Sequence, residues 1–388
     1  MGDCLEVRFC RVRGGWACSA ILLLFSAQPQ PLSAPAHGDP AADPAGPPYP
    51  PSAVLADITW HWDSLRTAAP GSDLWPVTWA EDGDIYTAWG DGGGFGGNDS
   101  DGRVALGFAR ISGTPDDYRA ANVNGGKGAL FPASFPRAGK AEALAAVGPT
   151  LYAWVNLQDG PWPDVNYALA WSANRGASWA LCPWRFERGA GRLKPGAFLN
   201  FGRAYTGVPR PLAGYVYFYA SPQGNRKDIF LGRVAVQQVR DQTAYRFFAG
   251  LDGRRPRWSH QAEDAVSVFH DEHDMGDTAS VVYMPALKRY LLTTFHQGPG
   301  QLGVFDAPDP WGPWTTVAYY EDWGGMGARG VGLTCSFPAK WMSPDGRNVW
   351  CVFSAYGDGA QQGIRAHDRF NLVRATLVPR RRRNHAAP

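Results

Sequence analysis

The sequence lacks the features that would connect it to nucleic acids, membrane spans or zinc chemistry. Its formal net charge at pH 7 is only +2, so no overall field favours a nucleic-acid partner or a strongly acidic one. The apolar run from Trp16 to Ala27 is too short to cross a bilayer. None of the six cysteines has the spacing of a zinc ligand, and no Ser-His-Asp or Cys-His arrangement is evident. We therefore expect no cofactor and no stable membrane span.

The composition instead favours strands. The 388 residues include 47 Gly, 32 Pro and 17 Trp, and aromatic residues make up 13% of the chain. Aromatic-rich segments separated by Gly and Pro turns are typical of all-β proteins. The length is enough for a large core, arranged as one big domain or two ordinary ones.

The first 36 residues have the pattern of a secretory signal peptide. Arg8, Arg11 and Arg13 precede the short apolar run, and Ala34-Pro35-Ala36 fits the small-x-small cleavage rule. We therefore expect a secreted or cell-wall-associated protein; a membrane-tethered start is the alternative. Residues 37–56 form a Pro/Ala-rich segment that predicts a disordered linker, and residues 379–388 predict a disordered basic tail.

Cleavage of the signal peptide would leave three cysteines in the mature chain. These are Cys182, Cys335 and Cys351. Cys335 and Cys351 flank one predicted hairpin, and the sequence leaves open whether they form a disulfide in an oxidising compartment.

Five similar units fill residues 57–378. Each has a first strand, a turn and an aromatic-rich second strand, followed by a third and usually a fourth strand. The second strands read IYTAW, LYAWV, YVYFY, YLLTTF and VWCVF, and their continuous apolar character predicts burial on both faces. The third unit is expected to begin at Phe201. Five units of four antiparallel strands predict a five-bladed β-propeller; two β-sandwiches are the competing architecture.

Two shorter segments fit the same interpretation. Asp57–Asp63 has no strand partner of its own and is expected to pair with the last blade and close the ring. Ser172–Trp179 reads S-A-N-R-G-A-S-W and matches the Asp-box pattern, a turn between the third and fourth strands of a blade.

The propeller topology separates turn acids from acids at the channel mouth. Starts of first strands and second-to-third loops share one face, and the other turns lie on the opposite face. A structural role is expected for the turn acids, which are Glu81, Asp82, Asp84, Asp306, Asp309 and Asp345. At the mouth, we expect acids from several blades to converge on one funnel.

Converging carboxyl groups are what glycoside hydrolysis requires, because one must be protonated and another ionised. Asp73 and Asp91 are the principal catalytic candidates; the alternates are Glu142, Asp159 and Asp277. The residues expected to bind substrate are Trp75, Trp162, Arg203, Asp228 and His296. The competing interpretation is that the acids cap strands or hold a structural Ca²⁺ in the channel. His270–Asp277 is interpreted as a loop, and no metal site is assigned.

Several ordered motifs resemble the family called domain of unknown function 4185. They are WPVTWAEDGDIYTAWGDG, NFGRAYTG, YRFFAGLDGRRPRW, VVYMPALKRYLLTTF, DAPDPWGPWTTVAYYED and FPAKWMSPDGRNVWCVFS, and they extend over Asp57 to Val378. The resemblance implies a secreted five-bladed β-propeller related in architecture to arabinanase-like glycoside hydrolases. Some members are endo-D-arabinanases that cut mycobacterial cell-wall arabinan. Asp73 occupies the place where related furanosidase propellers keep a catalytic acid.

The sequence thus predicts a secreted, monomeric glycoside hydrolase that acts on a furanose-rich polysaccharide. A non-catalytic glycan-binding propeller is the alternative, and a lyase acting on a uronic acid is a third reading. The sugar, the linkage, endo or exo action and the stereochemical outcome are left open.

Overall fold

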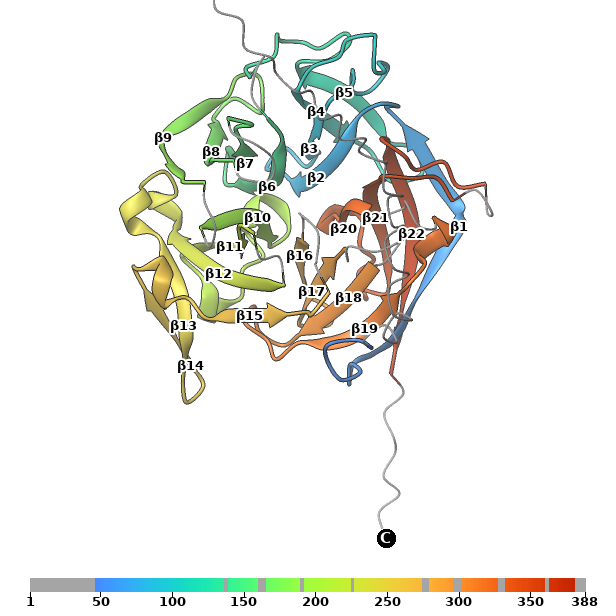
Figure 1. The fold of residues 1–388 in the computed structure, drawn as a ribbon. Coiled ribbons are helices and arrows are strands. Elements are labelled where there is room, and N and C mark those ends of the chain that lie inside the picture. Colours follow the sequence, from blue (N-terminus) through green and yellow to red (C-terminus); the bar gives the residue numbers. More distant parts are fainter. Residues whose placement is uncertain are drawn as a thin grey trace, which may run out of the picture. The chain divides into compact units, whose positions relative to one another are not determined.

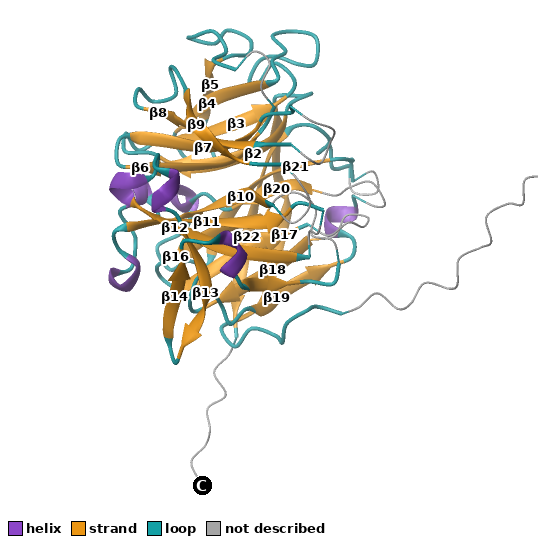
Figure 2. Cartoon of the chain, turned by 60° about the vertical axis from the view of Figure 1, so that its left-hand side comes forward, coloured by secondary structure: helices purple, strands orange, loops and turns teal. Residues whose placement is uncertain are grey.

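The computed structural model describes residues 46–135, 139–159, 165–188, 192–224, 227–273, 279–295, 302–326, 332–359 and 363–380. The fold is all-β with antiparallel sheets. Figure 1 shows groups of strands arranged around a common centre, and Figure 2 shows that helix is confined to short segments between strands. No helix in the described ranges is long and apolar enough to cross a membrane.

Two four-stranded groups open the chain. The first contains β2 (Asp73–Trp79), β3 (Ile85–Gly90), β4 (Leu106–Ser112) and β5 (Arg119–Asn124). The second contains β6 (Ala141–Val147), β7 (Thr150–Asn156), β8 (Tyr167–Ser172) and β9 (Ala180–Phe186). Consecutive strands pair in order in both groups.

The third and fourth groups are joined into one sheet of ten strands. The third contains β10 (Leu193–Asn200), β11 (Tyr215–Pro222), β12 (Asp228–Ala235), β13 (Arg246–Asp252), β14 (Arg255–Ser259) and β15 (Ser267–His270). The fourth contains β16 (Ala279–Met284), β17 (Arg289–Thr294), β18 (Leu302–Ala307) and β19 (Thr315–Tyr320). A short parallel pairing of β10 with β16 joins them, at Leu199↔Val281 and Asn200↔Val282.

The last group unites the two ends of the described chain. It contains β20 (Gly332–Ser336), β21 (Asn348–Ala355), β22 (Phe370–Pro379) and β1 (Leu55–Ala68). β1 runs antiparallel to β22 from Leu55↔Pro379 to Ala68↔Phe370. This pairing confirms the prediction that Asp57–Asp63 completes the sheet of the last strands.

The remaining helical segments are single 3₁₀ turns. They are η1 (Arg203–Tyr205), η2 (Arg210–Leu212), η3 (Val236–Gln238), η4 (Gln242–Ala244), η5 (Ala262–Asp264), η6 (Trp323–Gly325) and η8 (Ala339–Trp341).

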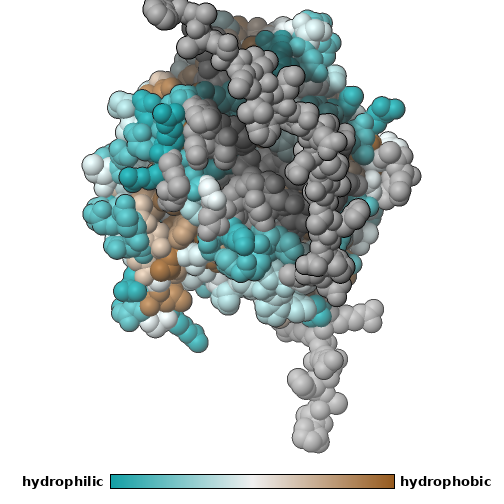
Figure 3. All heavy atoms as spheres, viewed as in Figure 1, coloured by the Kyte–Doolittle hydropathy of each residue, from teal (hydrophilic) through white to brown (hydrophobic). Residues whose placement is uncertain are grey.

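The first strands of the five groups lie toward the centre and the last strands toward the outside (Figure 1). Each inner strand contacts the next, from β2 through β6, β10 and β16 to β20, and β20 contacts β2. Figure 3 shows that the described surface on this side is mostly hydrophilic, with hydrophobic atoms gathered at the lower left.

The tryptophans serve mainly as core. Trp154 stacks on Phe198 at a centroid distance of 5.4 Å, and Trp75 stacks on Trp89 at 5.6 Å. The second strands are buried as predicted; every residue of β3 is buried. The first pair joins two neighbouring groups of strands and the second lies within one group; both bury large apolar surfaces.

The Asp-box segment has the predicted position and geometry. It lies between β8 and β9. Asn174 Oδ1 accepts hydrogen bonds from the Ser172 hydroxyl at 2.9 Å and the Ser178 N–H at 3.0 Å. Trp179 stacks on Phe108 at 4.0 Å and so ties this turn to the first group of strands.

Two expectations about boundaries were wrong. The predicted linker is ordered from residue 46: the Tyr49 ring packs on Phe269 at 5.1 Å, and buried Ser52 accepts a hydrogen bond from the Leu55 N–H. Of the predicted tail, residues 379–388, Pro379 ends β22, and residues 381–388 lie outside the described residues. The third inner strand is β10 rather than a strand beginning at Phe201. The prediction missed it because its Lys-Pro-Gly triplet is typical of a turn.

Two further expectations concern side chains. Asp306 lies within β18 rather than in a turn, where it is fully buried and bonded to Arg289 Nε at 2.7 Å. In the described part of the chain Cys182, Cys335 and Cys351 are buried free thiols, so the disulfide left open by the sequence is not formed.

Candidate active site

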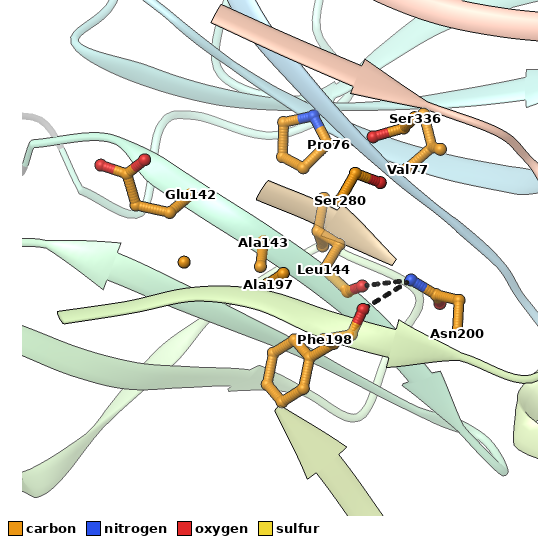
Figure 4. A pocket seen from close by; sticks show the side chains of 11 residues that line it. Pro76, Val77, Glu142, Ala143, Leu144, Ala197, Phe198, Asn200, Ser280 and Ser336 are labelled. Atoms are coloured by element: carbon orange, nitrogen blue, oxygen red, sulfur yellow. Dashed lines mark hydrogen bonds between the residues drawn. The ribbon is translucent and has the colours of Figure 1, made fainter. Parts of the chain in front are cut away.

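A narrow central cavity is lined by residues of all five inner strands. Its volume is about 20 Å³, and it is bordered by residues of β2 (Pro76, Val77), β6 (Glu142–Leu144), β10 (Gly196–Phe198, Asn200), β16 (Ser280) and β20 (Ser336). Figure 4 shows these residues, with the Glu142 carboxylate at one end of the lining. The cavity therefore brings together residues of all five inner strands, with the Glu142 carboxyl group among them.

Asp73 begins β2, the strand that supplies Pro76 and Val77 to the cavity lining. Its Oδ1 atom is enclosed and has no hydrogen-bond partner among the described residues, while the residue as a whole is partly exposed. Burial raises the pKa of Asp73 to about 7; the ammonium of Lys140 lowers it, and the carboxyl groups of Asp91, Asp368 and Glu142 raise it further. Such a carboxyl holds its proton at a pH where an ordinary aspartate is ionised.

The backbone beside Asp73 is strained. Leu74 and Trp75 have φ values of 75° and 68°, which side chains other than glycine rarely adopt. The strand pairing between β2 and β3 shifts register between Leu74 and Val77. Backbone strain of this kind occurs often at functional sites, where the surrounding structure enforces it.

Asp91 follows β3 and is held by two cations. Its Oδ1 lies 2.7 Å from Lys140 Nζ and 3.1 Å from a guanidinium nitrogen of Arg103. Lys140 also donates to the backbone carbonyl of Ala105 at 3.1 Å. This lysine precedes β6 and therefore connects the second group of strands to the first.

Glu142, the second residue of β6, is buried beside the same lysine. Asn156 at the end of β7 donates from Nδ2 to Glu142 Oε1 at 2.5 Å, and its Oδ1 accepts from the Lys140 N–H at 2.9 Å. Asn156 thus fixes both the backbone at Lys140 and the carboxylate of Glu142.

Asp368 is a fourth acid close enough to act on Asp73, and the sequence did not single it out. Its carbonyl accepts from the Gly71 N–H at 2.8 Å, next to Asp73 in the chain. Burial raises the pKa of the Asp368 carboxyl, as do Asp99 and Asp91, while His367 and Arg103 oppose the rise. It lies in the loop between β21 and β22, which is a second-to-third loop, so the same positional rule would have found it.

The structure brings Asp73, Asp91 and Glu142 together, but it gives Asp159 and Asp228 other surroundings. Asn166 donates to both oxygens of Asp159, at 3.1 and 2.7 Å. These bonds outweigh partial burial and lower the pKa of Asp159, which suits a loop-fixing role. Asp228 binds His270 Nδ1 at 2.9 Å, where β12 pairs with β15.

Two residues expected to bind substrate are placed elsewhere. Trp75 is fully buried among Trp89, Phe95 and Phe370, so its ring offers no face to a ligand. Arg203 lies in η1, after β10 rather than at a strand start, and donates to the carbonyl of Glu81 at 3.0 Å. Glu81 is in the β2–β3 turn, at the opposite end of that hairpin from Asp73.

Three other candidates, Asp277, Trp162 and His296, lie outside the described residues. Within the described ranges, no group of three or more His, Cys, Asp or Glu side chains is arranged to hold a metal ion. Sequence reasoning also missed Lys140, Asn156 and Arg103, because their importance comes from contacts between segments far apart in the chain.

The sequence matches the model of one protein family. The description of that family is "Domain of unknown function (DUF4185)", and the match extends over residues 145–356. The chain belongs to the DUF4185 family. No functionally curated protein matches the sequence.

Solved structures similar to this DUF4185 protein have low sequence identity to it. One is a GH43_1 enzyme from Xanthomonas citri, with a TM-score of 0.45 and 12% identity over 81% of this chain and 87% of that chain. Another is the RS223 beta-xylosidase, with a TM-score of 0.44 and 10% identity over 84% and 98%. A third is the catalytic domain of a GH62 alpha-L-arabinofuranosidase from Coprinopsis cinerea, with a TM-score of 0.42 and 10% identity over 80% and 97%.

Proposed function

We propose that this DUF4185 protein is a glycoside hydrolase whose catalytic carboxyl groups lie at the mouth of a five-bladed β-propeller. The observation that carries the proposal is the surroundings of Asp73. Its Oδ1 atom is enclosed, Asp91, Asp368 and Glu142 act on it, and burial raises its pKa to about 7; Glu142 also lines the cavity between the five inner strands. A carboxyl kept protonated near neutral pH, with an ionisable partner close by, meets the chemical requirement for glycosidic cleavage.

The proposed five-bladed arrangement is supported by how the inner strands meet. Five groups of strands each contribute one strand to the cavity lining, and β20 contacts β2 as well as β16. Pairing of β1 with β22 gives the last group its fourth strand. In such a ring the inner strands begin on one face, which gathers their first side chains at a single opening.

In the proposed reaction Asp73 donates its proton to the glycosidic oxygen as the bond to the anomeric carbon breaks. Glu142, held by Asn156, is the second carboxylate. It either removes a proton from the attacking water or attacks the anomeric carbon itself, depending on the distance between the two carboxyl groups in the substrate complex. Asp91 keeps Lys140 in place rather than contacting the sugar.

The finer assignments come from the sequence. The family resemblance favours a furanose-rich polysaccharide as the substrate, with endo-D-arabinanase activity as the specific form. The N-terminal pattern of residues 1–36 favours secretion, and we propose a monomer, because one chain supplies all five lining strands.

A digest screen tests the proposal. Purified protein is incubated with D-arabinan, L-arabinan and arabinogalactan, and new reducing ends are counted. We expect cleavage of at least one furanose polymer, reduced by about 10²–10⁴-fold in Asp73→Asn and in Glu142→Gln. Asp345→Asn, in an exposed turn at the other end of its hairpin, is the matched control. Binding of these polymers without new reducing ends would support the glycan-binding alternative instead.

A further inference from the structure

Lys140 and Asp73 share the space above Gly90. A Cβ atom on Gly90 would lie 2.6 Å from Asp73 Oδ1 and would overlap the stem of Lys140. The glycine therefore leaves room for two side chains from different groups of strands, and it makes them immediate neighbours. Gly90 pairs with Asp73 across the β2–β3 ladder, which fixes this arrangement.

The ammonium of Lys140 has three N–H donors, and two of them have acceptors in the structure. Asp91 Oδ1 accepts at 2.7 Å and the Ala105 carbonyl at 3.1 Å. The Lys140 side chain is only 13% exposed, whereas that of Asp91 is 41% exposed. The lysine is thus the buried member of the ion pair, and it faces the enclosed Oδ1 atom of Asp73, which has no hydrogen-bond partner among the described residues.

We infer that Lys140 is a positioning residue whose ammonium moves from Asp91 toward Asp73 when the Asp73 carboxyl loses its proton. The lysine remains protonated throughout, and no bond other than a hydrogen bond is made or broken by it. Its place in the catalytic cycle rests on the proposed function, but the movement depends only on the charge of Asp73.

The charged groups around Asp73 set the expected response. Lys140 is the cation that faces it; Asp91, Asp368 and Glu142 are the anions. Loss of the lysine charge removes the attraction that favours an ionised Asp73. Loss of the Asp91 charge does the reverse, because it removes a repulsion and frees the ammonium to approach Asp73.

Carboxyl NMR on protein labelled with ¹³C-aspartate tests the inference without any substrate. The Asp73 resonance is identified by its loss in Asp73→Asn, and its titration midpoint is then measured in each variant. We expect the midpoint to rise by about one pH unit in Lys140→Met, which keeps the apolar stem, and to fall by about one unit in Asp91→Asn. Lys140→Arg keeps the positive charge, so its Asp73 midpoint should lie close to that of the wild type.

Lys127→Met is the matched control, since Lys127 forms an exposed ion pair with Asp101; the Asp73 midpoint in this variant should equal that of the wild type. An unchanged midpoint in Lys140→Met, or a rise in Asp91→Asn, would overturn the inference. If Lys140→Met does not fold, the Asp73 midpoint in Asp91→Asn tests the inference by itself, because that variant keeps the lysine.

The two proposals fail separately. Cleavage of a polysaccharide together with unmoved midpoints would reject the role of Lys140 and keep the hydrolase. The predicted shifts without cleavage of any polymer would keep the Lys140 contact and reject the hydrolase.

Discussion

At the scale of single residues, the buried carboxyl of Asp73 links protonation to stability. Its pKa is about 7 in the folded protein and near 3.8 without the fold, so the folded state binds this proton more tightly. The stabilisation from that proton is complete below about pH 4 and is lost as the pH rises to about 7. Above that pH the folded chain carries a buried charge.

We therefore predict that Asp73→Asn, which cannot ionise, gains stability relative to the wild type between pH 5 and pH 8. The gain should be at most about 4 kcal/mol, and urea unfolding at both pH values measures it. Asp116→Asn is the control, because that exposed carboxyl pairs with Arg66 at the surface. An equal difference between Asp73→Asn and wild type at both pH values would show that Asp73 does not titrate in this range.

The sequence found the acids of the site better than their partners. Asp73, Asp91 and Glu142 follow from a positional rule, since strand starts and second-to-third loops share a face. Lys140 and Asn156 do not, because their contacts join different strands and loops, and no local pattern marks them. Trp75 was misassigned for a related reason: the left-handed φ values at Leu74 and Trp75 break the simple alternation of strand faces.

At the scale of one element, the Asp-box turn between β8 and β9 is held by side-chain hydrogen bonds to its own backbone. Asn174→Ala would remove the acceptor of the Ser178 N–H and the Ser172 hydroxyl. We predict a loss of about 1 kcal/mol in the free energy of unfolding, measured by chemical denaturation. Asn174→Asp keeps the acceptor and should stay within about 0.5 kcal/mol of the wild type. Equal losses in both variants would contradict an acceptor role.

Elements with strong apolar runs were predictable, and those with mixed signals were not. The second strands are recognisable in the sequence as continuous apolar runs, because they are buried on both faces. β10 is not recognisable as a strand in the sequence, because it contains Lys194, Pro195 and Gly196, a triplet that normally marks a turn. Pro195 is tolerated there because the strand bends at that point, where its pairing with β11 shifts register.

At the scale of the whole molecule, β1 closes the last sheet against β22. We predict that deletion of residues 1–68 lowers the melting temperature by more than 10 °C or yields aggregated protein, since it exposes the edge of β22 and removes the buried side chains of Leu55 and Ile58 from the core. Deletion of residues 1–45, which leaves Tyr49, Ser52 and β1 in place, is the control. Similar melting curves for the two deletions would show that β1 is dispensable.

The overall organisation was largely readable from the sequence. Repetition of one strand pattern predicted the groups, and the unpartnered segment Asp57–Asp63 predicted the pairing with the last strand. The ordering of residues 46–56 was not readable, because a Pro- and Ala-rich composition indicates little apolar burial. Individual contacts hold this segment in place despite its composition. The Tyr49 ring packs on Phe269, and Arg380 Nε donates to the Ser52 carbonyl at 2.6 Å.

The pairing of Leu55 with Pro379 also imposes an order of events on the newly made chain. β1 leaves the ribosome first among the strands. It cannot form its hydrogen bonds to β22 until almost every other residue has been synthesised. Contacts this distant in sequence form slowly and leave partly folded chains open to association. Maturation of this protein therefore ends with a single late step, the docking of its two ends, and helpers that shield exposed strands should act before that step.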